Sequence, residues 1–348
     1  MTHNSPARRT RATLARILPF ILAAAAAMTC QAAPVGMNIT NGNEVRAELT
    51  TTSIVMGEPL YLKITIVNRA SPLQKANFGA RLYLTEGHDI AITVQSPGEL
   101  PRRYTAAEQP GNYPSVEVDL RDGMSVYYLI PLIYDARSPN GFLFGKPGDY
   151  YISVKLSYSI LREPVKNITE IPLTKIRVAA PEGKTAEAFT LVASPDAARA
   201  MQTLLCGSPD VFGKVTHLAS DYPATPYAPL CALLSAIDYM ERKTPDYEAA
   251  IRVFIENYLR KYPADIRTSD AIFNIVACYT KLKQMEIARE WFYYLMDHDP
   301  SYNLLRPENP TSRFFYFGDL EESGRRRWWH YEKPWNIPPP PADKQQGS

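Results

Sequence analysis

Apolar and polar residues alternate with a period of two along the first half of the chain, from about Val45 to Ala180. Successive side chains of a β-strand point to opposite faces, so each alternating run predicts a strand with one buried and one wet face. The clearest runs cover 60–67, 115–121 and 150–159, and further strands are expected at 81–85, 90–95, 124–134 and 168–179. Asp122-Gly123 predicts a tight hairpin between two runs. About eight short strands without a helical period between them predict an antiparallel β-sandwich over residues 34–180.

After Pro181 the spacing of apolar residues changes to three and four, which is typical of amphipathic helices. Residues 181–193 are expected to be a linker and 194–302 an α-helical domain. Ser194-Pro195-Asp196 predicts a helix start, because Ser caps a helix and Pro suits its first position. Apolar helical faces follow within residues 247–262, 271–282 and 287–295.

Three short motifs each close an apolar helical run in this second half. They are Tyr222-Pro223-Ala224, Tyr262-Pro263-Ala264 and Asp299-Pro300-Ser301, and their prolines are 40 and then 37 residues apart. A period in this range with a closing Pro indicates helix-pair repeats, in which each unit buries its apolar face against the next. Such arrays usually bind other proteins.

Residues 268–300 resemble a tetratricopeptide repeat. Tyr279, Ala288, Phe292 and Pro300 fall at the family's spacing for its Tyr, small Ala, Phe and closing Pro, whereas Ile272 and Val276 replace its Trp and Gly. The preceding unit, 245–263, is one residue longer between Ala250 and Pro263. The resemblance implies two to three degenerate repeats that form an all-α, protein-binding array.

Gly148-Asp149-Tyr150-Tyr151-Ile152 resembles the opening of the penultimate strand of immunoglobulin-like domains. In that family the Tyr pins a loop and a Cys bridges the two sheets. Ile152 stands at the Cys position, so no inter-sheet disulfide is implied. Gly57-Glu58-Pro59-Leu60 also looks like the start of the second strand of bacterial immunoglobulin-like modules. The resemblance implies a fold and no ligand.

The first 33 residues are expected to be a signal peptide. Four arginines precede an apolar core of 12 residues, Ile17 to Met28, which is too short to span a bilayer as a helix. Small residues follow, so cleavage near Ala32 is the simplest interpretation. Lipoprotein anchoring through Cys30 and twin-arginine export through Arg8-Arg9 match their motifs less well. We therefore expect an exported protein, periplasmic or secreted, most simply in a bacterium.

Charge argues against nucleic acid as a partner. The chain carries 38 basic and 36 acidic residues, and removal of the leader's four arginines leaves 34 against 36, a net charge of −2. Near-neutrality does not suit a general polyanion binder. No later segment of the sequence is long and apolar enough to cross a membrane as a helix.

No catalytic or metal-binding motif stands out in the sequence. The four histidines beyond the leader, His88, His217, His298 and His330, are far apart, and only His88-Asp89 beside Glu86 suggests a weak carboxylate–histidine site. We therefore expect no enzymatic activity, cofactor or metal, although residues distant in sequence could still assemble a site. Cysteines 206, 231 and 278 remain after cleavage, and Cys206 with Cys231 is the nearest pair for a disulfide; the alternative is three buried thiols.

An aromatic and arginine-rich segment, 303–336, follows the helices, and a Pro-rich tail, 337–348, is expected to be disordered. Aromatic faces stack on sugars and Arg contacts anions, so the segment suggests a patch for an envelope glycan, a lipid or a protein. The alternative, which we favour, is that it covers the open end of the repeats. The patch residues are Arg325, Arg326, Arg327, Trp328, Trp329, Tyr331 and Trp335.

Together these features favour an exported, non-catalytic adaptor of the bacterial envelope that binds an unidentified protein. The alternative is an accessory protein or hydrolase subunit that binds envelope glycans.

Overall fold

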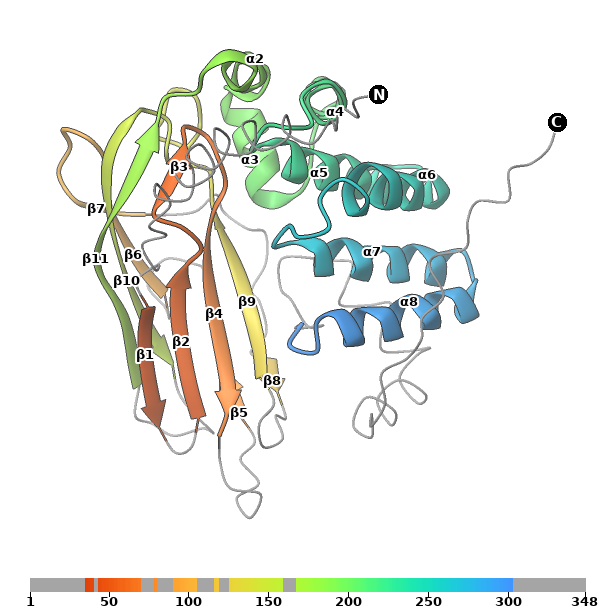
Figure 1. Ribbon diagram of the computed structural model, residues 1–348, viewed down its shortest axis with the longest axis horizontal. Coiled ribbons are helices and arrows are strands. Elements are labelled where there is room, and N and C mark those ends of the chain that lie inside the picture. Colours follow the sequence, from red (N-terminus) through yellow and green to blue (C-terminus); the bar gives the residue numbers. More distant parts are fainter. Residues whose placement is uncertain are drawn as a thin grey trace, which may run out of the picture. The chain divides into compact units, whose positions relative to one another are not determined.

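Two large β-sheets and one two-stranded sheet in the N-terminal half are followed by seven α-helices in the described part of a computed structural model (Figure 1). The structure describes residues 35–40, 43–69, 78–80, 90–104, 116–118, 125–158 and 167–302, all within one compact unit. The expected leader, the strand at 81–85, the Asp122-Gly123 hairpin, His88 and everything after residue 302 lie outside these ranges.

The first sheet has the order β1-β2-β4-β9 and is antiparallel throughout. The second has the order β3-β11-β10-β6-β7 and is antiparallel except where β3 runs parallel to β11. A separate pair, β5 (Phe78–Ala80) and β8 (Val116–Val118), forms a third, small sheet. The strands of the first sheet are β1 (Val35–Thr40), β2 (Asn43–Leu49), β4 (Leu60–Asn68) and β9 (Ser125–Leu132). Those of the second are β3 (Ser53–Val55), β6 (Ile90–Gln95), β7 (Arg102–Arg103), β10 (Gly148–Tyr158) and β11 (Asn167–Ala179).

Alternation along the strands produces a core between the two sheets. Leu62 and Ile64 on β4 are fully buried, as are Ile152 and Leu156 on β10, and all four belong to one hydrophobic cluster. The polar residues between them point to the opposite faces. Mostly antiparallel sheets are thus confirmed, while β1, β2, β3, β5 and β7 were not individually predicted.

Tyr150 pins the loop before β10, as the sequence motif suggests. Its hydroxyl donates to the carbonyl of Lys146 at 3.1 Å and lies 3.2 Å from the Lys146 nitrogen, which donates to it. The side chain is buried against Phe144, with ring centroids 5.2 Å apart. The hydrogen bonds fix the corner at which the chain enters β10.

The helical region begins earlier than expected, because α2 lies inside the stretch predicted as a linker. Its Phe189 packs against Phe142 of the β-region, with centroids 5.7 Å apart. Gly57 permits this approach, since a Cβ there would lie 2.4 Å from the Phe189 ring. The helices are α2 (Gly183–Val192), α3 (Pro195–Thr203), α4 (Pro209–Asp221), α5 (Ala228–Glu241), α6 (Tyr247–Arg252), α7 (Thr268–Lys281) and α8 (Met285–His298), with the π-helix η2 (Val253–Leu259) continuing α6.

Local signals account for several helix boundaries. The Ser194 side chain accepts the Ala197 N–H at the start of α3, as predicted. Ser208 caps α4 in the same way by accepting from Val211, again with Pro at the next position. Each cap satisfies one of the backbone donors that a helix start leaves unpaired.

The three proline motifs each follow the end of a helical run and form the same turn. The carbonyls of Tyr222, Tyr262 and Asp299 accept the N–H three residues later, each at 3.1 Å. The π-helix explains the extra residue of the middle unit, because a π-turn holds one residue more than an α-turn. We refer to the turns that begin at Tyr222, Tyr262 and Asp299 as the first, second and third turns.

Candidate functional site

The most elaborate arrangement of polar side chains in the described residues lies where the helices meet β9, the last strand of the first sheet. An edge strand presents unpaired N–H and C=O groups, which must find partners when buried. Gln202 of α3 supplies three bonds here. Its Oε1 accepts the N–H groups of Ile133 and Tyr134 at 2.9 and 3.2 Å, and its Nε2 donates to the Pro131 carbonyl at 2.8 Å. Pro131 is in β9, and Ile133 and Tyr134 directly follow it, so the amide pairs the backbone at the end of this strand. Gln202 is 2% exposed.

The third turn covers the other end of β9. The Tyr127 N–H donates to the Ser301 carbonyl at 3.2 Å, and Tyr127 and Tyr302 form a parallel bridge. The hydroxyls of Ser125 and Ser301 are also bonded, 2.5 Å apart. The residues just after α8 therefore add a short strand-like contact to the sheet edge.

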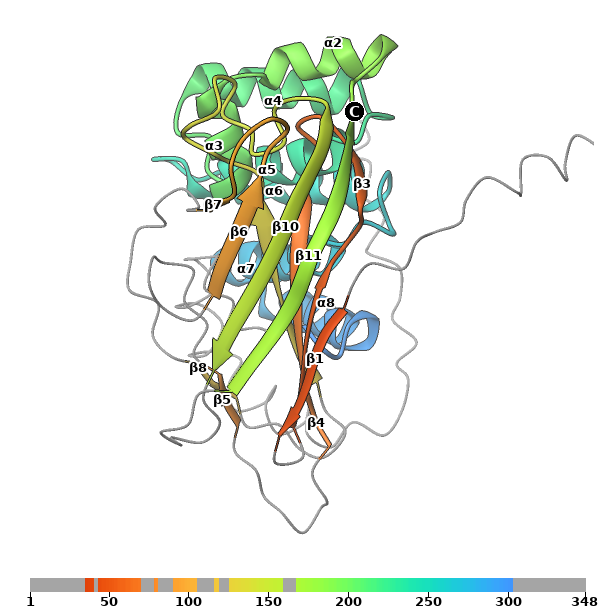
Figure 2. The ribbon, with the colours of Figure 1, turned by 90° about the vertical axis from the view of Figure 1, so that its left-hand side faces the viewer.

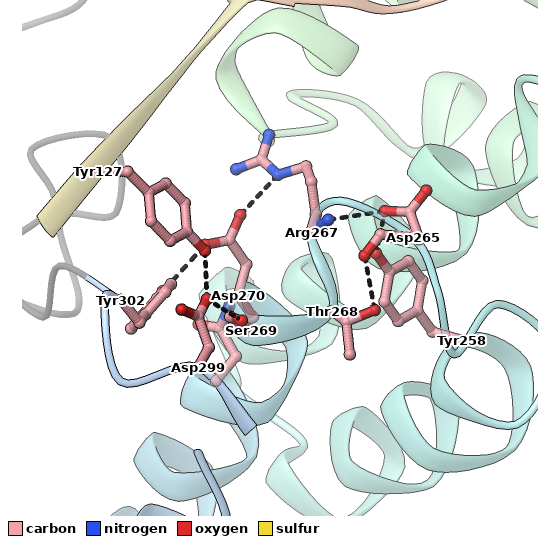
Figure 3. Close-up of polar contacts among 10 residues, drawn as sticks. Tyr127, Tyr258, Asp265, Arg267, Thr268, Ser269, Asp270, Asp299 and Tyr302 are labelled. Carbon is pink, nitrogen blue, oxygen red and sulfur yellow. Dashed lines mark hydrogen bonds and ion pairs between the residues drawn. The ribbon is translucent and has the colours of Figure 1, made fainter. Parts of the chain in front are cut away.

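A buried set of polar side chains, here called the junction cluster, surrounds this contact (Figure 3). Its members are Tyr127, Arg267, Ser269, Asp270, Asp299 and Tyr302. Each of these residues except Asp299 is at most 7% exposed. They come from β9, from the start of α7 and from the third turn, so the cluster joins the two regions.

Two carboxylates organise the cluster. Asp299 accepts hydrogen bonds from the Tyr127 hydroxyl at 2.5 Å and the Ser269 hydroxyl at 2.6 Å. Asp270 accepts from Arg267 Nε at 2.6 Å and from the Tyr302 hydroxyl at 2.9 Å. Charged acceptors make stronger hydrogen bonds than neutral ones, so these contacts are well suited to fix a junction.

Arg267 also connects the cluster to the first sheet and to the second turn. Its guanidinium carbon lies 5.8 Å from the centre of the Tyr61 ring on β4, and the backbone N–H of Arg267 donates to the Asp265 carboxylate at 2.9 Å. Asp265 accepts a further bond from the Tyr258 hydroxyl at 2.5 Å. Burial raises the pKa of Tyr61 and of Tyr258, and the negative charge of Asp265 raises both further, so both phenols stay neutral and Tyr258 remains a donor.

The contacts of the junction cluster act as a clamp that holds the third turn and the start of α7 against β9. Donors and acceptors are matched within the cluster, and its ion pair is almost fully buried, with Arg267 and Asp270 side chains 4% and 7% exposed. Removing one partner of such a pair leaves an uncompensated buried charge. Among the described residues, no group of three or more His, Cys, Asp or Glu side chains could hold a metal ion.

A second set of contacts joins the helices to the turn between β3 and β4. Tyr227, just before α5, donates its hydroxyl to the Met56 carbonyl at 2.8 Å, and its ring lies 6.0 Å from that of Phe189. Tyr61, Tyr127 and Leu129 from the sheet belong to the same hydrophobic cluster as the helices. The outer face of the β4–β9 side is thus part of the helical core.

The structure does not describe the predicted aromatic and arginine patch, whose residues 325–335 lie beyond Tyr302. Cys206 and Cys231 are described as free, buried cysteines, so the suggested bridge is not formed here. Burial raises the pKa of both thiols, which disfavours the reactive thiolate. The bridge stays a prediction that a count of free thiols in the exported protein would test.

Two histidines fall in the described region. His217 Nδ1 lies 3.3 Å from Asp221 one helical turn later on α4. His298 stacks on Tyr294 at the end of α8, with ring centroids 5.9 Å apart. The structure does not bring these two residues into the junction cluster.

Sequence reasoning missed the junction cluster because its members are far apart in the chain. Tyr127 and Asp299 are separated by 172 positions. One signal was available: Asp265 and Asp299 lie beside the closing prolines of two turns, and Arg267, Ser269 and Asp270 crowd polar groups into a helix start.

Comparisons with known proteins do not identify a family. No protein-family model matches the chain, and no curated protein matches it. Among solved structures, a partial match is a β-glucosidase from Erythrobacter marinus, at 13% sequence identity and a TM-score of 0.21. The match covers 42% of this chain and 16% of that one, and a likeness of this size carries no argument. In the described residues no helix has the length and apolar character needed to span a membrane.

Proposed function

We propose that this chain is an exported adaptor of the bacterial envelope that binds another protein through its helical array, and that it does no chemistry itself. The observation that carries the proposal is the junction cluster. Two regions joined by the Tyr127–Asp299 hydrogen bond and by a common apolar core keep a fixed geometry, whereas loosely joined domains move relative to each other. A fixed geometry suits a protein that presents one surface relative to another.

The strand order supports an immunoglobulin-like β-region. In such domains one sheet is built around the penultimate strand and the other around the second strand of the fold. Here β10 lies between β11 and β6 in one sheet, and β4 lies between β2 and β9 in the other. β10 and β4 would therefore correspond to those two central strands. The hydrogen bonds of Tyr150 match the tyrosine corner of that fold. Folds of this kind commonly serve as rigid bodies in extracellular proteins.

The packing of α7 and α8 supports tetratricopeptide-like repeats. Ala288 is fully buried and Phe292 is 4% exposed, as expected for the small residue and the large residue that fill a helix pair. Tyr294 on the same helix is 37% exposed and packs edge-on against Trp291. An exposed Tyr supported by buried aromatics is a common anchor of protein interfaces, so α8 is the part of the array that we assign to partner binding.

The test is site-specific photo-crosslinking in intact cells of the organism that makes the protein. A photoreactive residue at Tyr294 is compared with one at Leu100, which is 85% exposed but lies in the loop between β6 and β7. We expect one defined polypeptide to crosslink at Tyr294 and none at Leu100. N-terminal sequencing of the same material, with a start near Ala33 expected, tests export.

A different result would favour the glycan-binding alternative. If neither position captures a polypeptide while the mature protein is retained on a peptidoglycan or polysaccharide column, the adaptor proposal is wrong. Recovery of an intact Met1 form from the cytosol would contradict export.

A further inference from the structure

Strand β1 carries a row of exposed apolar side chains. Val35, Met37 and Ile39 are 48%, 56% and 58% exposed, and their spacing of two places all three on the outer face of the first sheet. Across the strand pair their neighbours on β2 are Glu48, Arg46 and Glu44. The apolar row thus lies at the rim of the sheet, with charged residues one strand behind it.

The inner face of β1 is already occupied by the second sheet. Gly36 lies against β11 so closely that a Cβ there would be 2.2 Å from the Glu170 carbonyl oxygen. Asn38 Nδ2 donates to the Ile168 carbonyl at 3.1 Å. Figure 2 shows β1 and β11 side by side. Among the described residues, the second sheet therefore takes the inner face of β1, and the outer face carries the apolar row.

The other sheet ends are protected in ways that β1 is not. Natural proteins protect edge strands with charges, proline, shortness or a covering element. In the described residues, β9 is covered by Gln202 and the third turn, β7 is two arginines, and β3 has three residues. β1 has six residues, Val-Gly-Met-Asn-Ile-Thr, without a charge or a proline.

We propose that β1 is a self-association site, at which two copies of this chain pair their first sheets edge to edge in an antiparallel register centred on Met37. This register places Val35 opposite Ile39 of the second copy and Met37 opposite itself. A two-fold axis makes the two contacts equivalent. The proposal is independent of the adaptor function, because it concerns only the β-region and a second copy of the same chain.

The charge distribution favours a second copy as the occupant. The six uncharged residues meet no like charge across the two-fold axis, and the charged row of β2 remains one strand away on each side. A charged or strongly polar peptide would find no complementary group on β1 itself. A contact of one strand per copy falls at the low end of interface sizes, below about 1,200 Å², so the dimer is expected to be weak and concentration-dependent.

Sedimentation velocity of the full mature chain over a wide concentration range tests the proposal. We expect the wild type to shift from monomer to dimer and Met37→Lys to remain monomeric, because the register places the two introduced lysines, with like charges, directly opposite each other. Leu173→Lys is the matched control. Leu173 is 63% exposed on β11, outside the apolar row, and this variant should dimerise like the wild type.

Cysteine crosslinking tests the register. In Met37→Cys the two introduced thiols lie directly opposite each other, and oxidation should give a covalent dimer. Leu173→Cys should not, and the described native cysteines are all buried. A wild type that is monomeric at every concentration overturns the proposal. This holds both if hydrogen exchange shows the β1 amides to be protected by another part of the same chain and if it shows them to exchange with solvent. A dimer that persists in Met37→Lys also overturns it.

Discussion

The two edge strands of the first sheet, β9 and β1, differ in how their edges are covered in the described part of the chain. At β9, Gln202 and the third turn supply partners for the backbone, and the junction cluster lies beside them. At β1 the described residues leave three large apolar side chains about half exposed. Both strands obey the same two-residue alternation, so alternation alone does not determine whether a sheet end is buried.

The difference shows what burial of a sheet edge requires. Leu129 of β9 packs into the helical core, and such apolar packing excludes water from the strand. The backbone N–H and C=O groups of the strand then need hydrogen-bond partners within the protein. At β9 a single amide side chain and a two-residue contact meet that need. At β1 no such polar complement is described, which suits a contact with another strand.

The largest effect is expected at Gln202. Gln202→Ala removes the partners of two buried N–H groups and one carbonyl, each of which costs about 1–3 kcal/mol when left unsatisfied, so a loss of about 4 kcal/mol is expected. Chemical denaturation of the mature chain measures it. Thr203→Ala on the same helix removes only a local bond to the Arg199 carbonyl and should change stability by less than about 0.5 kcal/mol. Equal effects would mean that the Gln202 bonds do not hold the edge.

Phe292→Ala tests the array that carries the third turn to β9. A buried aromatic replaced by Ala is expected to cost about 3 kcal/mol, because the helix pair cannot fill the cavity fully. Thermal melts and hydrogen exchange should show lower stability and faster exchange of the Tyr127 amide. A negligible shift in melting temperature would show that Phe292 does not fill the helix pair.

Tyr302→Phe removes one member of the junction cluster with little change in shape. The lost hydroxyl donates to the buried carboxylate of Asp270, and a hydrogen bond to a charged group contributes about 2 kcal/mol. Tyr294→Phe removes an exposed hydroxyl on α8 and serves as the control, with no measurable change in the denaturation midpoint expected. An unaltered midpoint in Tyr302→Phe would contradict the role of the cluster as a clamp.

Glu44, on β2 beside the open edge, should give a smaller and pH-dependent effect. Burial raises its pKa, but hydrogen bonds from Arg69 and Arg46 outweigh burial and lower the pKa below its ordinary value of 4.5. A lowered folded-state pKa stabilises the protein above the unfolded-state pKa, and this contribution is lost as the pH falls through the folded value.

Glu44→Gln should therefore cost about 1 kcal/mol at neutral pH, since both arginines are partly exposed and screened by solvent. It should also flatten the acid side of the stability profile. Denaturation midpoints measured from neutral to acidic pH test both points. A parallel profile in wild type and variant would show that Glu44 is not the titrating group.

The smallest effect on folding is expected at the open edge. Met37 is 56% exposed, so Met37→Lys should change the free energy of unfolding by less than about 0.5 kcal/mol. Measured at low concentration, where the chain is monomeric, its denaturation curve should overlay that of the wild type. A clear loss of stability would mean that Met37 is part of the core of a single copy.

Sequence patterns were sufficient where the physical cause is local. The alternation of β4 and β10, the Ser194 cap and the three closing prolines each depend on neighbours within a few positions. The helix α2 was missed because the stretch 181–193 is short and its Phe189 packs against residues that are distant in sequence, Phe142 and Tyr227. The junction cluster could not be predicted, since it forms only when the third turn reaches β9. Its residues contribute hydrogen bonds across the fold and no periodic pattern.

The π-helix η2 has a consequence for how the helical runs of this chain can be compared with one another. Pro263 follows Ala250 by 13 positions, whereas Pro300 follows Ala288 by 12, yet both runs end in the same turn. The π-helix accommodates the extra residue, because a π-turn holds one residue more than an α-turn. Two helical runs can therefore end in the same turn although their spacings in sequence differ by one residue. A comparison that assumes a fixed spacing will miss this correspondence, whereas an alignment that follows the turns will find it.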